Sequence, residues 1–299
     1  MSARLMLVHA HPDDETSQTG ATLARYAAEG RVTLVTCTLG EAGDIVADDL
    51  SYLTAETLGE HRLGELHAAM ADLGVTDYVR LGGDFAYRDS GMTTDEQGTV
   101  HPLDDLHPDC FWRADLLEAA THLVALIRDR RPQVLATYDT VGGYGHPDHV
   151  QAHRVAMYAY VLAGTASFRP DLGGAWTVSR VLWTAWDAAS VPEMVAVADQ
   201  LGLSELLTGW FDPGAELPPM FVPHEYIGAR VHEQPWAAQV ASALGRYRSQ
   251  VDVDDPWWQF VKVAPDVPRY ESFRLAAGVP FPPGEHPATD LFAGLSLDD

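Results

Sequence analysis

The strongest constraint on the fold of this chain is an alternation of short apolar runs with longer helical patterns. The short runs are rich in β-branched and aliphatic residues and predict strands, whereas apolar residues spaced three and four apart predict helices. This order is typical of a parallel sheet with helices on both faces. We therefore predict an α/β fold with a Rossmann-like, doubly wound, mostly parallel sheet. Strands are expected at residues 4–10, 32–38, 78–81, 134–138 and 178–185, and helices at 15–29, 63–73, 114–130 and 149–163.

The pattern weakens after residue 190, where several prolines interrupt it. We predict that residues 1–190 form the α/β core and that residues 191–299 form a C-terminal elaboration of the same domain. This elaboration is expected to cover the ligand-binding edge of the sheet, and a small separate subdomain is the alternative. A helix is predicted at residues 237–250, and the polar stretch 91–111 is predicted to be a long loop.

Charge and composition limit the partners of this chain. With 19 Lys and Arg against 43 Asp and Glu, the net charge is −24, and no basic patch is present to bind nucleic acid or an anionic membrane. We expect a small-molecule partner that is neutral or cationic. Two cysteines are too few for a disulfide framework, and no apolar stretch approaches a membrane span. A cytoplasmic location is therefore expected, and the oligomeric state stays open.

Two polar segments stand where predicted strands end. One reads His-Pro-Asp-Asp-Glu at residues 11–15, and the other reads His-Pro-Asp-His at residues 146–149. A single such segment is usually a turn, because Pro and Asp are turn formers. Two of them at strand ends favour a functional site, because open α/β sheets bind ligands at the carboxyl ends of their strands.

The residue types in these segments suit a catalytic metal. His11, Asp14 and His149 offer two imidazoles and a carboxylate, a set typical of catalytic zinc with one position left for water. Ferrous iron accepts the same ligands. Asp13 cannot easily share the metal with its neighbour, because adjacent side chains point in different directions. It can instead act as the general base on the water.

Two further residues are candidates for proton donation, and a third can tune one of them. If the Asp148 carboxylate hydrogen-bonds a ring nitrogen of His146, the pKa of His146 rises, and the ring can donate to an oxyanion or a leaving amine. Tyr144 lies in a glycine-rich loop at residues 142–145 and can supply a second donor. A simple packing role for Tyr144 is an equal alternative.

The paired segments resemble the signature of the LmbE/PIG-L family of zinc-dependent N-deacetylases. The similarity covers the first 190 residues well and the tail only patchily. Within the family it is closest to the members that act in mycothiol biosynthesis, which implies hydrolysis of the acetamide of N-acetylglucosaminyl-inositol. The resemblance implies that His11, Asp14 and His149 are the zinc ligands and that Asp13 is the general base. It also implies that His146 is the charged partner in the transition state, tuned by Asp148, and that Tyr144 is a mobile oxyanion donor.

The same resemblance implies four substrate-binding residues. Arg62 and Asp89 match residues that contact sugar or inositol hydroxyls, and Met92 matches a residue lining the pocket. Asp44 stands in the loop after the second predicted strand, where the family usually has a glutamate. The alternative for Arg62 is a surface salt bridge to a neighbouring glutamate, and the alternative for Asp89 is a turn or cap residue.

Other functions compete with this one. The segment at residues 108–111 is closer to a sister amidase that cleaves mycothiol S-conjugates, and a deacetylase of another aminosugar would need a different pocket wall. A non-catalytic metabolite-binding module is the alternative from a different class. Against it, the first predicted strand is followed by acidic residues and not by a glycine-rich phosphate loop.

Overall fold

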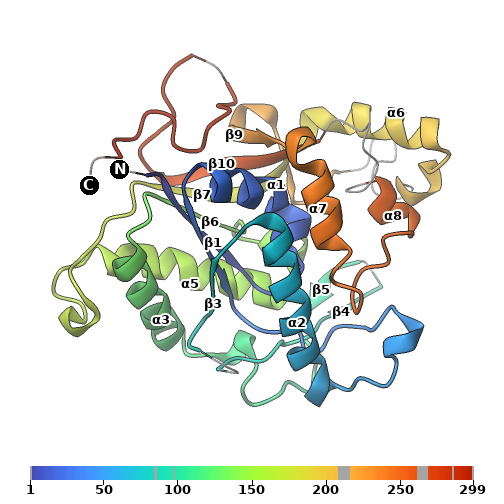
Figure 1. Cartoon of the computed structure of the whole chain (residues 1–299), viewed down its shortest axis with the longest axis horizontal. Helices are drawn as coiled ribbons and strands as arrows, with labels where there is room; N and C mark the ends of the chain where they lie inside the picture. The colour runs from blue at the N-terminus through green and yellow to red at the C-terminus, as the bar shows by residue number, and fades with distance from the viewer. Residues whose placement is uncertain are drawn as a thin grey trace.

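A computed structural model describes residues 2–83, 86–96, 98–207, 216–260, 269–284 and 286–297 of the chain. One sheet runs through it with strand order β3-β2-β1-β6-β7-β10-β9, and β8 pairs beside β7 (Figure 1). The first five strands of this order are mutually parallel, whereas β10 is antiparallel to both β7 and β9. The predicted mostly parallel α/β fold is confirmed. The strands are β1 (Arg4–His9), β2 (Arg31–Thr36), β3 (Asp77–Arg80), β6 (Val134–Thr137), β7 (Arg180–Asp187), β8 (Phe221–Val222), β9 (Ile227–His232) and β10 (Tyr270–Gly278).

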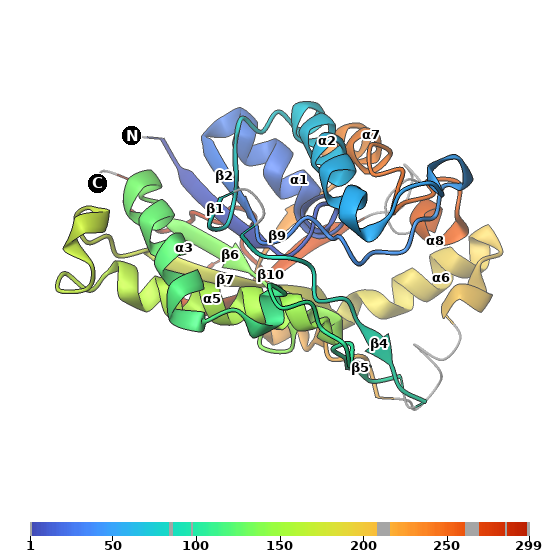
Figure 2. The same ribbon diagram turned by 90° about the horizontal axis from the view of Figure 1, so that it is seen from below.

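Helices cover both faces of the sheet, as expected for a doubly wound fold. Figure 2 shows α1, α2 and α7 above the sheet and α3 and α5 below it. The helices are α1 (Asp14–Glu29), α2 (Ala55–Leu73), α3 (Leu116–Arg130), α4 (Gly142–Gly145), α5 (Pro147–Ala163), α6 (Val191–Leu201), α7 (Ala237–Leu244) and α8 (Pro256–Trp258). Among the described helices, none combines the length and the apolar character needed to cross a bilayer.

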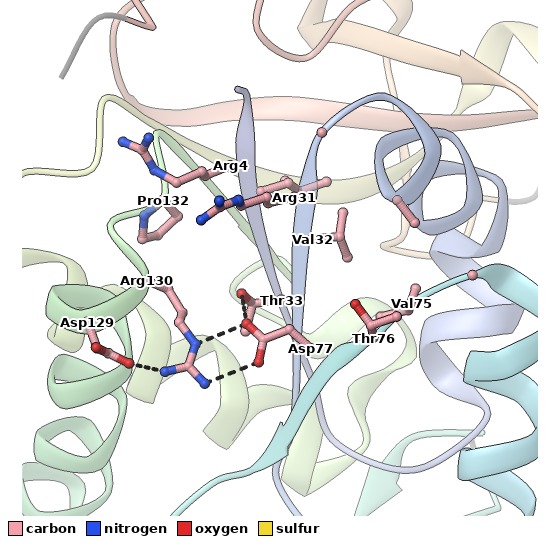
Figure 3. Close-up of a pocket in the computed structure, with 14 residues that line it drawn as sticks. Arg4, Arg31, Val32, Thr33, Val75, Thr76, Asp77, Asp129, Arg130 and Pro132 are labelled. Atoms are coloured by element: carbon pink, nitrogen blue, oxygen red, sulfur yellow. Dashed lines mark hydrogen bonds and ion pairs between the residues drawn. The ribbon is translucent and has the colours of Figure 1, made fainter. Parts of the chain in front are cut away.

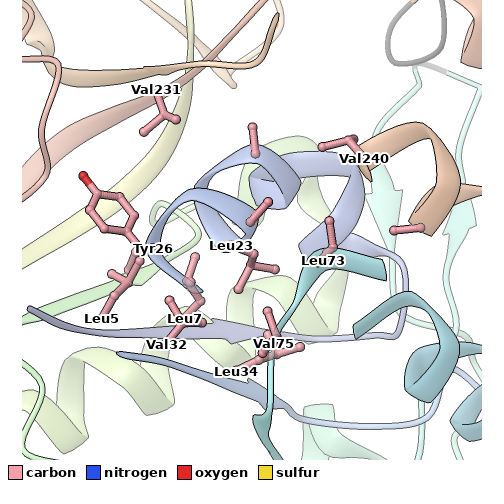
Figure 4. Close-up of a cluster of buried hydrophobic side chains, with 14 of the residues drawn as sticks. Leu5, Leu7, Leu23, Tyr26, Val32, Leu34, Leu73, Val75, Val231 and Val240 are labelled. Carbon is pink, nitrogen blue, oxygen red and sulfur yellow. The ribbon is translucent and has the colours of Figure 1, made fainter. Parts of the chain in front are cut away.

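Strand β1 divides the core into two halves. Leu5 and Leu7 pack into the cluster under α1, α2 and α7 (Figure 4), while Met6 and Val8 pack into the cluster under α3 and α5. Successive side chains of a strand point to opposite faces, so a strand buried on both faces is apolar at every position. This explains why the run at residues 5–8 lacks the polar alternation of a half-exposed strand.

The order of the strands places a crevice beside β1. The chain runs from β1 outward to β2 and β3 and then returns to form β6 on the other side of β1. The connections that leave the carboxyl ends of β1 and β6 therefore go to opposite faces of the sheet. Such a switch point is where ligands bind in open α/β sheets.

Several predicted boundaries need correction. Helix α2 begins at Ala55, earlier than its apolar pattern predicted, because Thr54 and Thr57 form a capping box there. In α3 the buried stripe begins at Ala119, so Leu116 and Leu117, in the first turn, are exposed. The predicted loop at residues 91–111 contains a short antiparallel pair, β4 (Thr93–Thr94) and β5 (Val100–His101).

The region beyond residue 190 continues the sheet. Strands β9 and β10 extend it, and α7 packs against α1 and α2. Helix α7 ends at Leu244, shorter than predicted, because Gly245 and the turns after it replace its last two turns. Glu271 in β10 reaches α1 where that helix is broken at Thr19, and its carboxylate accepts the N–H groups of Ala21 and Thr22.

Candidate metal and catalytic site

The two predicted segments meet at the switch point between β1 and β6. The first leaves β1 and enters α1, whose first residue is Asp14, and the second leads from β6 into α5. The ring centroids of His11 and His149 are 5.3 Å apart, and those of His11 and His146 are 4.6 Å apart. Residues separated by more than 130 positions in sequence thus form one buried polar cluster.

His149 presents a lone pair to a carboxylate. Its Nδ1 lies 3.2 Å from the carbonyl oxygen of Gly142, and because a carbonyl only accepts, Nδ1 carries the ring hydrogen. The Nε2 atom is buried without a hydrogen-bond partner, and it lies 3.2 Å from Oδ2 of Asp14. Two acceptor atoms this close repel one another unless a cation stands between them.

His11 lies between carboxylates on two sides. Its Nδ1 is 3.2 Å from Oδ2 of Asp14, and its Nε2 is 3.3 Å from Oδ2 of Asp148 and 3.4 Å from Oδ1 of Asp89. Burial acts to lower the pKa of His11, but these carboxylates, Asp89 foremost, outweigh it and raise that pKa well above its usual value. The surroundings therefore favour a positive charge here, whether a proton or a metal ion.

The donor set fits a catalytic zinc ion. Nδ1 of His11, Nε2 of His149 and Oδ2 of Asp14 converge, and two histidines with a carboxylate are a known catalytic zinc set. Ligand atoms of His11, His146 and His149 also lie within 4.8 Å of one another, as do those of His11, Asp89 and Asp148. We favour His11, Asp14 and His149. Asp148 and Asp89 face the other nitrogen of His11, where carboxylates typically support a ligating histidine.

Asp13 adopts a backbone conformation that is rare for a residue with a side chain. Its φ is 104°, in the region that favours glycine. Its N–H donates to Oε2 of Glu15 at 3.1 Å, and its Oδ2 accepts from Nη2 of Arg62 at 3.2 Å. Burial raises the pKa of Asp13 to about 7, although the Arg62 charge opposes the shift. A carboxylate with a pKa near neutrality suits a general base.

Arg62 is a buried residue of the site wall. Only 3% of its side chain is exposed, so the alternative of a surface salt bridge is wrong. Its Nη1 donates to the carbonyl of Gly40 at 2.9 Å, and its Nη2 donates to the carbonyl of Pro12 and to Asp13. Both terminal nitrogens are thus engaged within the protein. Contact with substrate hydroxyls stays a prediction from the resemblance.

The predicted pairing of Asp148 with the His146 ring is wrong. The Asp148 carboxylate accepts from the Ser90 N–H at 2.9 Å and from the Ser90 hydroxyl, and it faces His11. His146 is the N-cap of α5, and its Nδ1 accepts the backbone N–H of Asp148 at 3.1 Å. Burial and the charge of His11 lower the pKa of His146 to about 2, the opposite of the predicted shift. The cap geometry explains the error, because Nδ1 of His146 is an acceptor here and the Asp148 carboxylate is engaged by Ser90 and His11.

Asp89 is built into the wall beside His11. Its Oδ1 accepts the N–H of Gly91 at 2.8 Å, and its Oδ2 accepts the N–H of Ala42 at 3.2 Å. The first contact is the turn geometry considered as the alternative for this residue. Asp89 also faces Nε2 of His11. Its carboxylate therefore belongs both to the turn and to the buried polar cluster.

The remaining predicted residues are exposed. Tyr144 is 43% exposed, and its ring centroid is 5.1 Å from that of His149. Met92 is 44% exposed. The side chain of Asp44 is also exposed, and its carbonyl accepts from Nε2 of Gln250 at 3.0 Å. These positions leave the three side chains accessible to a ligand.

Three residues of the cluster escaped the sequence analysis. The Tyr138 hydroxyl donates to Oδ2 of Asp14 at 2.8 Å and accepts the N–H of Ala10 at 2.9 Å. Ser90 holds Asp148, and Glu41 accepts the N–H of Asp89 at 3.0 Å. A signal existed for Tyr138, which ends a predicted strand and is a polar residue at the ligand-binding edge. Ser90 and Glu41 lie in loops, where no periodicity identifies a partner.

A pocket of about 390 Å³ lies elsewhere, at the amino ends of β1, β2 and β3 (Figure 3). Arg4, Arg31 and Arg130 line it. The guanidinium of Arg130 pairs with Asp77, with Nε at 3.0 Å from Oδ2. The histidine and aspartate cluster stands at the opposite ends of the strands. We therefore place the chemistry at the cluster and not in this pocket.

Comparison with known proteins agrees with this placement. The family model PIG-L, described as GlcNAc-PI de-N-acetylase, matches residues 6–160 and includes both segments. A relative from Nocardioides sp. is named 1D-myo-inositol 2-acetamido-2-deoxy-alpha-D-glucopyranoside deacetylase, and it is 49% identical over 98% of both chains. A relative of the same name from Kribbella flavida is 46% identical, again over 98% of both chains. The alignment with both relatives thus includes the tail.

Solved structures share the fold. The N,N'-diacetylchitobiose deacetylase from Pyrococcus horikoshii superimposes with a TM-score of 0.55, covering 92% of this chain and 84% of its own, at 16% identity. That likeness concerns the fold alone. The family match over half the chain and the full-length relatives decide the membership: the chain belongs to the PIG-L family of de-N-acetylases.

Proposed function

We propose that this chain hydrolyses the acetamide of N-acetylglucosaminyl-inositol and releases acetate and glucosaminyl-inositol, a step of mycothiol biosynthesis. The observation that carries the proposal is the convergence of His11, Asp14 and His149 beside Asp13. The substrate rests on relatives with 46–49% identity that carry this activity in their names. Two buried, unpaired cysteines agree with a reducing compartment, so we place the protein in the cytoplasm.

We propose zinc as the metal, with ferrous iron as the alternative occupant, held by His11, Asp14 and His149. When bound, zinc supplies Lewis acidity that polarises a carbonyl and makes water more acidic. The carboxylates of Asp89 and Asp148 would support the site from the far side of His11. Tyr138 would do the same for Asp14.

We assign the proton transfers to Asp13. Its Oδ2 is committed to Arg62, which leaves Oδ1 to take a proton from the attacking water. The water oxygen adds to the acetamide carbon, and the C–N bond then breaks. The proton held by Asp13 passes to the departing amine nitrogen, so acetate and a free amine are the products. A pKa of about 7 allows Asp13 to accept and return the proton near neutral pH.

The oxyanion that forms during this reaction needs donors. Because Nδ1 of His146 accepts the Asp148 N–H, a neutral His146 carries its hydrogen on Nε2 and can donate it. We therefore assign His146 as a neutral donor, which replaces the charged role implied by the resemblance. Partial desolvation against the cluster and the nearby charge of Asp14 raise the pKa of Tyr144, so its hydroxyl keeps its hydrogen and can serve as a second donor.

We propose that the sugar and inositol are bound by the residues around this cluster. Asp44 and Met92 are exposed and accessible, and a carboxylate such as that of Asp44 suits vicinal hydroxyls. Asp89 and Arg62 are engaged within the protein. We expect them to shape the pocket as well as to contact the substrate.

The test compares two substrates on the zinc-loaded protein. Amine release from N-acetylglucosaminyl-inositol is measured beside release from a mycothiol S-conjugate, with Asp13→Ala as the control. Faster Asp13-dependent turnover of the first substrate is the expected result. Preference for the S-conjugate would make the protein an amidase, and no Asp13-dependent release from either would refute the proposed chemistry.

A further inference from the structure

Residues 247–250, shortly after the end of α7, form hydrogen bonds with three segments at or beside the site. The Tyr247 hydroxyl donates to Oε1 of Glu15 at 2.5 Å. The N–H and hydroxyl of Ser249 donate to the Glu65 carboxylate on α2 at 2.8 and 2.6 Å. Gln250 donates to the carbonyl of Asp44 at 3.0 Å. This segment lies outside residues 6–160, which the family model matches, yet it contacts elements that carry the proposed catalytic and substrate-binding residues.

Glu15 connects this segment to Asp13. The Glu15 side chain is wholly buried, and its Oε1 accepts hydrogen bonds from Tyr247 and from the Thr16 hydroxyl, each at 2.5 Å. Its Oε2 accepts the backbone N–H of Asp13 at 3.1 Å. One carboxylate therefore joins the C-terminal region to the backbone of the proposed base.

The backbone of Asp13 needs such an anchor. Its φ of 104° is unfavourable for a residue with a side chain, so surrounding contacts must maintain it. Arg62 holds the Pro12 carbonyl and the Asp13 carboxylate on one side. Glu15 holds the Asp13 N–H on the other. The hydroxyl of Tyr247 restrains the carboxylate that makes this second contact.

We propose that Tyr247 is a positioning residue for Asp13 and acts through the Glu15 carboxylate. The inference rests on the proposed role of Asp13 as base. The described polar contacts of the Tyr247 hydroxyl lead to Glu15 and Thr16 and not to His11 or His149. Tyr247 therefore affects the orientation of the base and leaves the metal ligands in place.

The first variant is Tyr247→Phe, which keeps the buried ring and removes the hydroxyl. Because hydrogen bonds to charged groups are among the stronger ones in proteins, we expect kcat to fall roughly ten-fold. We expect KM to change less than about two-fold and zinc affinity to stay unchanged, because substrate and metal contacts are intact. Zinc affinity is measured by competition with a chelator, so this readout does not depend on activity.

The matched control is Tyr26→Phe. Tyr26 is a buried tyrosine on α1, its hydroxyl donates to the Asp290 carboxylate at 2.8 Å, and it accepts the N–H of Leu291 at 2.8 Å. Its contacts lead to the C-terminal tail and not to Asp13. This variant is expected to lose thermal stability by an amount similar to Tyr247→Phe while keeping the kcat of the unmodified protein.

A second variant, Glu15→Gln, tests the connection itself. The Tyr247 hydroxyl and the Asp13 N–H donate to different oxygens of Glu15. Glutamine keeps an acceptor at only one of these two places and carries no charge, so kcat should fall again. The double variant with Tyr247→Phe should lose little more than the worse single variant, because the two act in series. An unchanged kcat in Tyr247→Phe, or a loss equal to that of Tyr26→Phe, would overturn the inference. If Asp13→Ala keeps its activity, the proposed base is wrong instead, which separates the two failures.

Discussion

The support that Tyr138 gives to Asp14 provides a quantitative test of the metal site. In Tyr138→Phe the ring remains stacked on His149, where the centroids are 4.2 Å apart and the planes 14° from parallel. The variant removes the hydroxyl that donates to Oδ2 of Asp14 at 2.8 Å. A hydrogen bond to a charged group is worth about 1.5–3 kcal/mol, and loss of such support lowers metal affinity about 10–100-fold. We therefore expect zinc affinity to fall by about one to two orders of magnitude.

The same change has a separate cost for the fold. The buried N–H of Ala10 loses its acceptor, which should lower the free energy of unfolding of the metal-free protein by about 1–3 kcal/mol. That corresponds to a decrease in Tm of a few degrees for a chain of this length. Denaturation of the metal-free protein measures this cost independently of zinc.

The assay is a competition titration of zinc against a chromophoric chelator. Tyr144→Phe is the control, because Tyr144 is a proposed oxyanion donor on the exposed side of the site. It should lose activity and bind zinc like the unmodified protein. If Tyr138→Phe shows the stability loss but binds zinc with unchanged affinity, Asp14 is not a ligand, and the reasoning from the convergent donor atoms fails.

Three further predictions concern stability and metal removal. Glu271→Ala leaves two N–H groups of α1 without their acceptor, so urea denaturation should show a loss of about 3 kcal/mol, and an unchanged midpoint would contradict this capping role. Burial raises the pKa of Asp77, but hydrogen bonds from Arg130 and Thr33 outweigh it and lower that pKa. This ion pair therefore stabilises the fold above the pKa of the unfolded state, about 3.9, and its contribution disappears as the pH falls below that value. The Tm difference between Asp77→Asn and the unmodified protein should be small at pH 7, because the pair is partly exposed. It should shrink as the pH falls below about 3.9 towards the lowered pKa of the folded state; a difference that grows in acid would contradict the assignment. Chelator should abolish amine release and added zinc should restore it, whereas activity that survives exhaustive chelation would argue against a metal-dependent reaction.

The sequence predicted the fold well where periodicity decides structure. The run at residues 5–8 is apolar at every position because β1 is buried on both faces. Residues 114–130 were expected as a helix, and α3 lies within them, although its buried stripe starts only at Ala119. The predictions were weaker at the ends of elements, where a cap such as Thr54 or a terminator such as Gly245 depends on local contacts.

The sequence by itself determined the succession of strands and helices along the first 190 residues, the burial of the strands, and the two polar segments that follow β1 and β6. These follow from patterns within a few neighbouring residues. Only the tertiary structure decided the partners of the polar groups. Asp148 contacts His11 and Ser90 and not the His146 ring. Arg62 is buried against Asp13. The Tyr247 hydroxyl donates to Glu15, which lies 232 positions away in the sequence. Hydrogen-bond partners far apart in sequence leave no local pattern, because only the packing of the sheet and its helices brings them together.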